Sequence, residues 1–447
     1  VFKRVQCGNA DDVVLGDCGE HLPESLDLVA DLGVRDPLRV PLRATPDTVA
    51  EELALSDRQL LRLARALLLA EPSLKNVLLC GGYRNGDLID SGTIVVRDGR
   101  IASVAAGTVD TGGLATIDGT GLTAMPGFID AHRHINTGPD ERAEMQAQLE
   151  AGYTTILSGG GPAEGNLTLK DRIDSGAING PRIIPSGRIG LADNTPQQAR
   201  EQVRELARMG IRFTGEIALT PEPRPSVHEI EVLEAIVDEA ADVGVTVQVH
   251  AVSTPAMVAA VEAGVRRLVH LPNKDFVDRD AAQMLADTDT LILATIGFGA
   301  PIFGVFADDN QARFRDGRPW PESIAGANRD AQDRAIGNEI GFTIVNARTV
   351  FDEGVVLGYC TDTRYDPWAG LRHELESYNV MFSMRDIVEI MGPNTARYIN
   401  MENELGTLEA GKLADIVLVA GNPLDGFWHM LDARVVLKEG AVVVDKR

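Results

Sequence analysis

The chain has 447 residues, of which 44% are apolar and 24% charged, values typical of a globular protein with two or three domains. Its 42 Lys and Arg residues face 66 Asp and Glu residues, and the formal charge of −24 argues against nucleic acids and anionic membranes as partners. No apolar run reaches the roughly 18 residues that a membrane-spanning helix needs.

The first 75 residues are expected to form an N-terminal extension. Residues 1–50 are acidic and irregular, whereas apolar residues recur at three- and four-residue spacing from Ser56 onward, which predicts a helix. Ser56 and Gln59 fit a capping box at its start. We expect this helix to pack on the main body or on a neighbouring subunit, and we assign no chemistry to it.

Two β-rich segments follow at opposite ends of the remaining chain. Residues 76–126 and 401–447 consist of short apolar runs separated by Gly turns, a pattern typical of small β-strands. Because chain termini usually lie near one another, we expect these segments to form one composite β-sandwich.

Between them, residues 127–400 alternate apolar strands with amphipathic helices, which implies a parallel sheet. The eight expected strands cover 127–131, 154–157, 182–185, 211–216, 245–249, 267–269, 291–294 and 355–358. Eight such units match a (β/α)8 TIM-like barrel. An open doubly wound sheet is the alternative, but no GxGxxG motif follows a strand. The predicted fold class is α/β, a barrel with a small β-sandwich domain.

Cysteine usage favours a reducing, cytoplasmic location. Cys7, Cys18, Cys80 and Cys360 are scattered and form no CxxC pair, so neither a disulfide framework nor a thiolate zinc site is expected. No signal-like apolar stretch follows Val1, so we expect no export signal in this chain.

Histidines are scarce, and their placement indicates a metal site. His132 and His134 end the first strand, where residues i and i+2 project from the same face. His250 ends the fifth strand, His270 the sixth, and Asp362 follows the eighth. Barrel active sites lie at the carboxyl ends of the strands. Imidazoles with a carboxylate suit Zn, Mn, Fe or Co, so we expect one or two divalent ions, with zinc preferred.

Four specific sequence motifs contain these residues, and a fifth lies near the end of the chain. They are Met125-Pro-Gly-Phe-Ile-Asp-Ala-His-Arg-His, Val249-His-Ala, Leu268-Val-His, Gly358-Tyr-Cys-Thr-Asp and Gly411-Lys-Leu-Ala-Asp-Ile-Val-Leu. On these motifs the chain resembles the metal-dependent amidohydrolase superfamily, most of all its imidazolonepropionase and prolidase-like branch. The resemblance covers roughly residues 76–447. It implies an enzyme with a barrel and a composite β-sandwich, a small-molecule substrate, one or two divalent metals and a homo-oligomeric state.

Many relatives join two metals through a carboxylated lysine on the fourth strand. No lysine lies between Lys170 and Lys274, where that strand is expected, so a lysine bridge is excluded if the strand count holds. Glu216 is the expected substitute, because a carboxylate can also join two cations. The alternative is a solvated loop carboxylate beside a single ion. In the family, a histidine at the position of His270 either binds metal or contacts substrate.

The expected reaction is hydrolysis of an amide, cyclic amide or carbamate C–N bond. A divalent cation can lower the pKa of its water from near 16 to about 7. Asp362 is the expected general base and then acid, and His250 is expected to help polarise the attacked carbonyl. One rival is a non-hydrolytic reaction at the same site, such as dehydration, isomerisation or C–C cleavage. An inactive scaffold is the other rival, and the presence of all these side chains disfavours it.

Three residues near expected strand ends are candidate substrate contacts: Arg188, Tyr153 and Lys274. The planar fork of Arg188 suits a carboxylate, although a surface salt bridge is an equal alternative. Residues 297–338 are long for a βα connection and hold several aromatic residues. We expect them to form a lid over the barrel mouth, with an oligomer contact as the alternative.

Overall fold

The computed structural model describes residues 26–27, 39–40, 92–107, 116–297, 335–363 and 366–447, and the chain divides into two compact units, Val1–Leu88 and Ile89–Arg447. In the first unit, the described residues form an antiparallel pair of strands, β1 (Leu26–Asp27) and β2 (Arg39–Val40). The predicted helix after Ser56 and the predicted boundary at residue 75 lie outside the described residues. Residues 298–334 of the predicted lid lie outside them as well.

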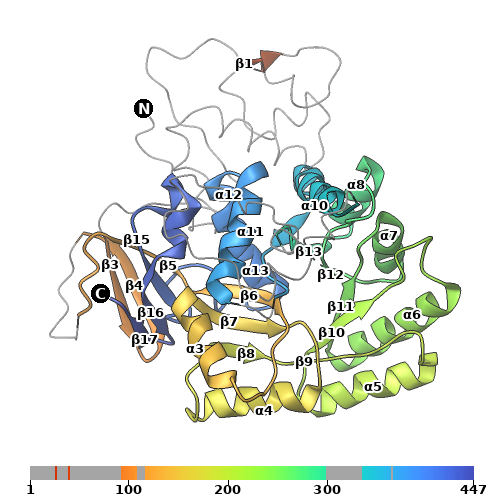
Figure 1. Cartoon of the computed structure of the whole chain (residues 1–447), viewed down its shortest axis with the longest axis horizontal. Helices are drawn as coiled ribbons and strands as arrows, with labels where there is room; N and C mark the ends of the chain where they lie inside the picture. Colours follow the sequence, from red (N-terminus) through yellow and green to blue (C-terminus); the bar gives the residue numbers. More distant parts are fainter. Residues whose placement is uncertain (1–25, 28–38, 41–91, 108–115, 298–334, 364–365) are drawn as a thin grey trace. The chain divides into compact units, whose positions relative to one another are not determined.

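Both ends of the second unit contribute to one antiparallel sheet, ordered β17-β16-β15-β5 (Figure 1). Its strands are β5 (Leu122–Pro126), β15 (Ile416–Ala420), β16 (Ala433–Lys438) and β17 (Ala441–Asp445). A hairpin, β3 (Gly92–Arg97) and β4 (Arg100–Ala106), packs on this sheet. Ile101 of the hairpin shares a buried apolar cluster with Ile416 and Val435. The expected composite β-sandwich is confirmed.

All eight strands expected between residues 127 and 358 are present, and their ladders are parallel, in one sheet of order β6-β7-β8 and one of order β14-β13-β12-β11-β10-β9. They are β6 (Phe128–Arg133), β7 (Tyr153–Ser158), β8 (Arg182–Ile184) with β9 (Ser186–Gly187), β10 (Phe213–Ala218), β11 (Thr246–His250), β12 (Arg267–Val269), β13 (Leu291–Leu293) and β14 (Val356–Gly358). Consecutive residues of β6 and β7 are all buried, as is typical of parallel strands covered by helices.

The parallel strands follow the order of a TIM-like barrel, with two interruptions. Pro185 separates β8 from β9 because proline has no N–H for the ladder, so the third strand is split into two pieces. At the other seam, β14 and β6 share no ladder. Two backbone hydrogen bonds join the chain there, from Ala131 N to Tyr359 O at 3.3 Å and from Asp362 N to His132 O at 2.8 Å. The barrel is therefore not closed by a continuous ladder.

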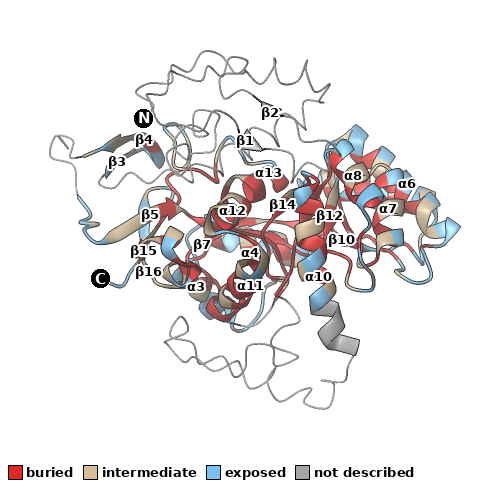
Figure 2. Ribbon diagram, turned by 90° about the horizontal axis from the view of Figure 1, so that it is seen from above, coloured by how far each residue is buried: buried red, intermediate tan, exposed pale blue. Residues whose placement is uncertain are grey.

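Helices alternate with the strands and turn their buried faces toward them (Figure 2). They are α3 (Glu141–Ala151), α4 (Ala163–Asp174), α5 (Pro196–Arg208), α6 (Val227–Val243), α7 (Thr254–Glu262), α8 (Arg279–Asp287), α10 (Ala335–Asp352), α11 (Pro367–Met381), α12 (Met384–Glu389) and α13 (Thr395–Tyr398). The π-helix η5 (Ile390–Asn394) joins α12 to α13, and two 3₁₀ turns, η6 (Pro423–Asp425) and η7 (Phe427–Leu431), precede β16. In the described part of the chain, no helix has the length and apolarity to cross a membrane.

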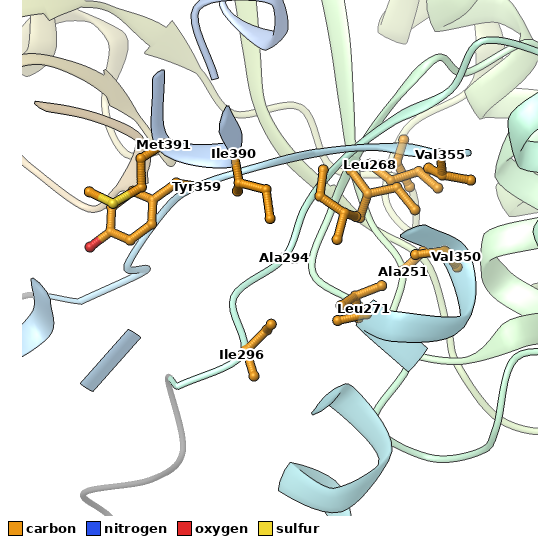
Figure 3. Packing of buried hydrophobic residues seen from close by; sticks show 14 of the residues in the cluster. Ala251, Leu268, Leu271, Ala294, Ile296, Val350, Val355, Tyr359, Ile390 and Met391 are labelled. Atoms are coloured by element: carbon orange, nitrogen blue, oxygen red, sulfur yellow. The ribbon is translucent and has the colours of Figure 1, made fainter. Parts of the chain in front are cut away.

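The apolar core between strands and helices fixes the strand ends that matter for function. Leu268 of β12, Val355 before β14 and Val350 of α10 belong to one buried cluster (Figure 3). Leu268 lies two residues before His270. Packing of this kind holds side chains in single conformations, so the residues that follow these strands start from a rigid base.

Candidate metal centre

The carboxyl ends of five parallel strands bring six chemistry-bearing side chains to one place. We call them the six-residue cluster: His132, His134, Glu216, His250, His270 and Asp362. They come from β6 and the residue after it, from β10, from the end of β11, and from the segments directly after β12 and β14. Residues more than 200 positions apart in the chain therefore meet in one cluster.

Glu216 contacts all four imidazoles. Its Oε1 lies 3.3 Å from His134 Nε2. Its Oε2 lies 2.8 Å from His250 Nδ1, 3.4 Å from His270 Nε2 and 3.7 Å from His132 Nε2. The two oxygens of this carboxylate thus face different histidines, so one carboxylate can serve two neighbouring positions.

Asp362 contacts three of the four imidazoles. Its Oδ1 lies 3.1 Å from His134 Nε2 and 3.4 Å from His132 Nε2, and its Oδ2 lies 3.6 Å from His270 Nε2. Asp362 has a left-handed backbone, with φ of 50°, which is uncommon for a residue with a side chain.

These separations fit a divalent cation. Two ligands at about 2.1 Å from one ion, at a tetrahedral angle, lie about 3.4 Å apart. The Nε2 atoms of His132 and His270 are buried and make no hydrogen bond within the described structure. Three overlapping sets of ligand atoms lie within 4.8 Å of one another: His132, His270 and Asp362; His132, His134 and Glu216; Glu216, His250 and His270. The donor types and the spacing allow the cluster to hold a metal ion.

Electrostatics favour a cation at this place. Burial raises the pKa of Glu216, but the close imidazoles of His134, His250 and His270 outweigh it and hold that pKa well below its usual range. The same balance, with His132 and His134 as partners, lowers the pKa of Asp362. In return, Asp362 and then Glu216 raise the pKa of His134 to about 9. Two ionised carboxylates thus lie among imidazoles whose ring nitrogens can bind either a metal cation or a proton.

Two glycines allow the strand ends to come this close. A Cβ at Gly159 would lie 2.7 Å from His132 Nε2, and a Cβ at Gly215 would lie 3.0 Å from Gly160 Cα. Glu216 N donates to Gly159 O at 3.1 Å, which ties the end of the second strand to the fourth. The glycine-rich segment after the second strand therefore has a positioning role beside the cluster.

His270 has a neutral partner behind it. Its Nδ1 lies 2.7 Å from Thr295 Oγ1, which in turn lies 3.2 Å from the thiol of the buried Cys360. A bond at Nδ1 orients an imidazole and leaves Nε2 available as a ligand. The sequence gives no sign of this role for Thr295, because no motif marks a threonine two residues after a strand.

No lysine reaches the cluster from the fourth strand. The strand count is confirmed, and β10 contains Glu216 but no lysine. Lys170 lies on α4, where it pairs with Asp174 on the helix surface. Glu216 thus occupies the strand on which the carboxylated lysine of many relatives is expected.

The three expected substrate contacts lie in different places. Arg188 is exposed and directly follows β9. Its Cα lies 3.4 Å from the point that a Cβ added at Gly215 would take. Lys274 is exposed in the loop that follows His270. Tyr153 is instead the first residue of β7, at the amino end of the strand, and its fully buried hydroxyl lies 2.7 Å from that of Tyr359. The structure therefore places Tyr153 in the packed interior and not with the cluster.

The sequence model of the amidohydrolase family matches residues 123–445, which include every parallel strand from β6 to β14 and every residue of the six-residue cluster. The chain belongs to this family. It is therefore an enzyme of the amidohydrolase type, with a fold and a cluster of possible metal ligands that agree with that membership.

Individual relatives of this amidohydrolase differ in how much they share with it. Imidazolonepropionase of Symbiobacterium thermophilum is 26% identical over 425 residues, 83% of this chain and 95% of the relative. Adenine deaminase of Shigella flexneri is 37% identical over 101 residues, 22% of this chain, and the match spans 17% of the deaminase. A solved protein of Bifidobacterium longum, proposed to be a prolidase, superposes with a TM-score of 0.66 at 27% identity, covering 80% of this chain and 91% of its own.

Proposed function

We propose that this amidohydrolase hydrolyses an amide, cyclic amide or carbamate C–N bond of a small organic molecule at a centre of two divalent ions. The observation that carries the proposal is the position of Glu216, whose two carboxylate oxygens face different histidines of the six-residue cluster. The family and its relatives that act on C–N bonds support the hydrolytic part.

Two of the three ligand sets, one with His132 and His134 and one with His250 and His270, share Glu216. We assign the first set, together with Asp362, to one ion and the second set to the other. Imidazole and carboxylate donors suit zinc first, and also manganese, iron or cobalt. Such ions supply Lewis-acid chemistry: they make water acidic enough to give hydroxide near neutral pH and they polarise a carbonyl group.

Asp362 is the residue that moves the proton. The close imidazoles of His132 and His134 lower the pKa of Asp362 and keep it ionised, so it can accept a proton from water at a carboxylate oxygen and then deliver it to the leaving nitrogen. His250 has the most exposed side chain of the cluster, at 31%, and so faces an incoming substrate. We assign it the task of orienting the carbonyl oxygen.

Arg188, which lies against Gly215, and Lys274, four residues after His270, are exposed positive charges in a chain of net charge −24. Within the described residues, Arg188 makes no ion pair. An exposed guanidinium next to the fourth strand is suited to bind a carboxylate of the substrate in its planar fork. A carboxylate-bearing substrate therefore fits the proposal.

The deciding experiment follows heavy oxygen from water into product. The zinc- or manganese-loaded protein is incubated in heavy-oxygen water with dipeptides, N-acyl amino acids, cyclic amides and carbamates, and the products are analysed by mass spectrometry. Hydrolysis must place the label in the new carboxylate of an amide substrate, or in the carbon dioxide released from a carbamate. Turnover without label would show that the same centre performs a non-hydrolytic reaction, and the absence of bound metal after reconstitution would show an inactive scaffold.

A further inference from the structure

Arg133 stands between the two histidines of the first strand but contacts a different part of the molecule. Its side chain is buried, with 3% of the residue exposed. Nη1 donates to Thr363 Oγ1 at 2.8 Å and to Thr361 Oγ1 at 3.3 Å, and it lies 3.9 Å from Asp130 Oδ2. The two threonines that receive these bonds flank Asp362 directly in the chain.

The other members of this buried group complete the hydrogen bonding. Thr361 N donates to Asp130 Oδ1 at 3.0 Å, and Thr361 Oγ1 donates to Asp130 Oδ2 at 2.6 Å. Thr363 Oγ1 donates to Thr361 Oγ1 at 3.1 Å. The amide of Gln148 on α3, with its oxygen turned to Arg133, accepts from Nη2 at 3.1 Å. Each hydroxyl in the group therefore has a donor or an acceptor, as a buried network requires.

This network lies at the seam where β14 and β6 share no ladder. On its other edge, β6 has a register shift in its ladder with β7 between Asp130 and Arg133. At the seam, side-chain hydrogen bonds of Asp130 and Arg133 therefore connect the two strands in place of backbone ladder bonds. They fasten the chain around Asp362 to the strand that carries His132 and His134.

Asp362 needs this support because of its backbone. A non-glycine residue with φ of 50° persists only where its surroundings over-determine it. The single backbone bond from Asp362 N to His132 O, at 2.8 Å, fixes one end of the residue. The hydrogen bonds that Asp130 and Arg133 make with the two flanking threonines fix the chain on both sides of Asp362.

We propose that Arg133, together with Asp130, Thr361 and Thr363, positions the Asp362 carboxylate against the cluster. We call these four residues the Arg133 network. The proposal rests on the proposed function, because positioning matters for catalysis only if Asp362 acts there. Arg133 is a positioning residue, since its burial keeps it from the substrate and its bonds reach Asp362 only through the threonines.

The test uses Thr363→Val in the full chain, because loss of the Arg133 charge could prevent folding. The matched control is Thr155→Val, which removes another buried hydroxyl that accepts from an arginine, at 2.8 Å from Arg182 Nη1. Three properties are measured: the thermal midpoint, the visible absorption spectrum of the cobalt-loaded protein, and kcat and KM on a substrate found in the labelling experiment. The cobalt spectrum reports ligand geometry without any turnover.

Both variants are expected to lower the thermal midpoint by similar amounts. Thr363→Val alone should change the cobalt spectrum and lower kcat tenfold or more with KM nearly unchanged, while bound metal stays constant. In the Asp362→Asn background, adding Thr363→Val should change the spectrum no further. A Thr363→Val protein with the spectrum and kcat of the control overturns the proposal. If no substrate is turned over, the proposed function fails, and the cobalt spectra still decide whether the network positions Asp362.

Discussion

Glu216 and His250 lie on neighbouring strands, with 2.8 Å between Oε2 and Nδ1, although the β10–β11 register sets Glu216 opposite Gln248 and His250 opposite Ala218. The carboxylate therefore reaches two residues along the sheet to meet the imidazole. Its other oxygen faces His134 from the first strand at 3.3 Å. One side chain thus links strands from two parts of the barrel, which is the geometry that a shared ligand requires.

Glu216→Gln is expected to reduce bound metal from two ions per chain to one or none. An amide presents one oxygen and no charge, so it cannot serve both ligand sets. The measurement is metal content per chain after reconstitution and gel filtration. Glu239→Gln is the control, because it removes a buried carboxylate that pairs with Arg204 on the helix surface, away from the cluster. One ion in both wild type and Glu216→Gln would show that Glu216 is not a ligand.

Thr295→Val is expected to weaken metal binding by about 10- to 100-fold, the usual effect of losing the partner behind a metal-binding histidine. The hydroxyl at 2.7 Å from His270 Nδ1 would be gone, so the imidazole would lose its fixed orientation. Competition with a chromogenic chelator measures the affinity. Thr290→Val serves as the control, because Thr290 is equally buried but precedes β13, whereas Thr295 follows it. Equal affinities for the two variants would contradict the role.

Gly159→Ala is expected to abolish activity and to lower metal content. The added Cβ would lie 2.7 Å from His132 Nε2, so either the imidazole or the strand end must shift. Gly341→Ala on α10 is the comparison, because a Cβ there meets nothing within 4 Å and alanine favours the helix by roughly 0.5–1 kcal/mol. Activity assays and metal analysis of both variants test the difference. Full activity in Gly159→Ala would show that His132 can move to make room for the added methyl group without loss of function.

The sequence could predict the strands and the convergence of the cluster for physical reasons. Apolar runs between helical stretches mark parallel strands, and in a barrel their carboxyl ends must share one face. Pairings across the fold have no such marker: Thr295 and Gly159 acquire their roles only through contact with histidines far away in the chain. Tyr153 precedes the expected strand 154–157 and begins the observed one, so it lies at the amino end, whereas barrel active sites lie at the carboxyl ends; nearness to a strand in the sequence is therefore no sign of a substrate contact. The expected homo-oligomer, the cytoplasmic location and the absence of nucleic-acid partners stay predictions.

The metal-free protein is expected to lose stability between pH 6.5 and 9. Asp362 and Glu216 raise the pKa of His134 to about 9, above the value of about 6.5 in the unfolded chain. A pKa raised by folding gives stability that is complete below 6.5 and is lost as the pH rises through 9. Thermal unfolding of the metal-free protein across this range measures it. His134→Asn should flatten this part of the profile, and an unchanged profile would contradict the assignment.

The same ionisation couples metal binding to pH. The cation must displace the proton of His134, so the apparent affinity should rise with pH up to about 9 and binding should release protons. Calorimetry in two buffers of different ionisation enthalpy counts those protons. Zero proton release at pH 7 would show that His134 is already neutral there.

Arg188→Met is expected to raise KM for a carboxylate-bearing substrate by about 10- to 100-fold with little change in kcat. A hydrogen bond to a charged group contributes about 1.5–3 kcal/mol, and each 1.4 kcal/mol is a factor of ten in binding. Metal content should stay at the wild-type value, because Arg188 is not part of the six-residue cluster. Arg208→Met, which removes an exposed arginine paired with Glu205 at the end of α5, is the matched control. An analogue of the substrate with an amide in place of the carboxylate separates charge recognition from shape. Wild type and Arg188→Met should bind this analogue equally. A KM difference that persists with the amide would show that Arg188 supports the structure of the barrel rim and does not bind the carboxylate.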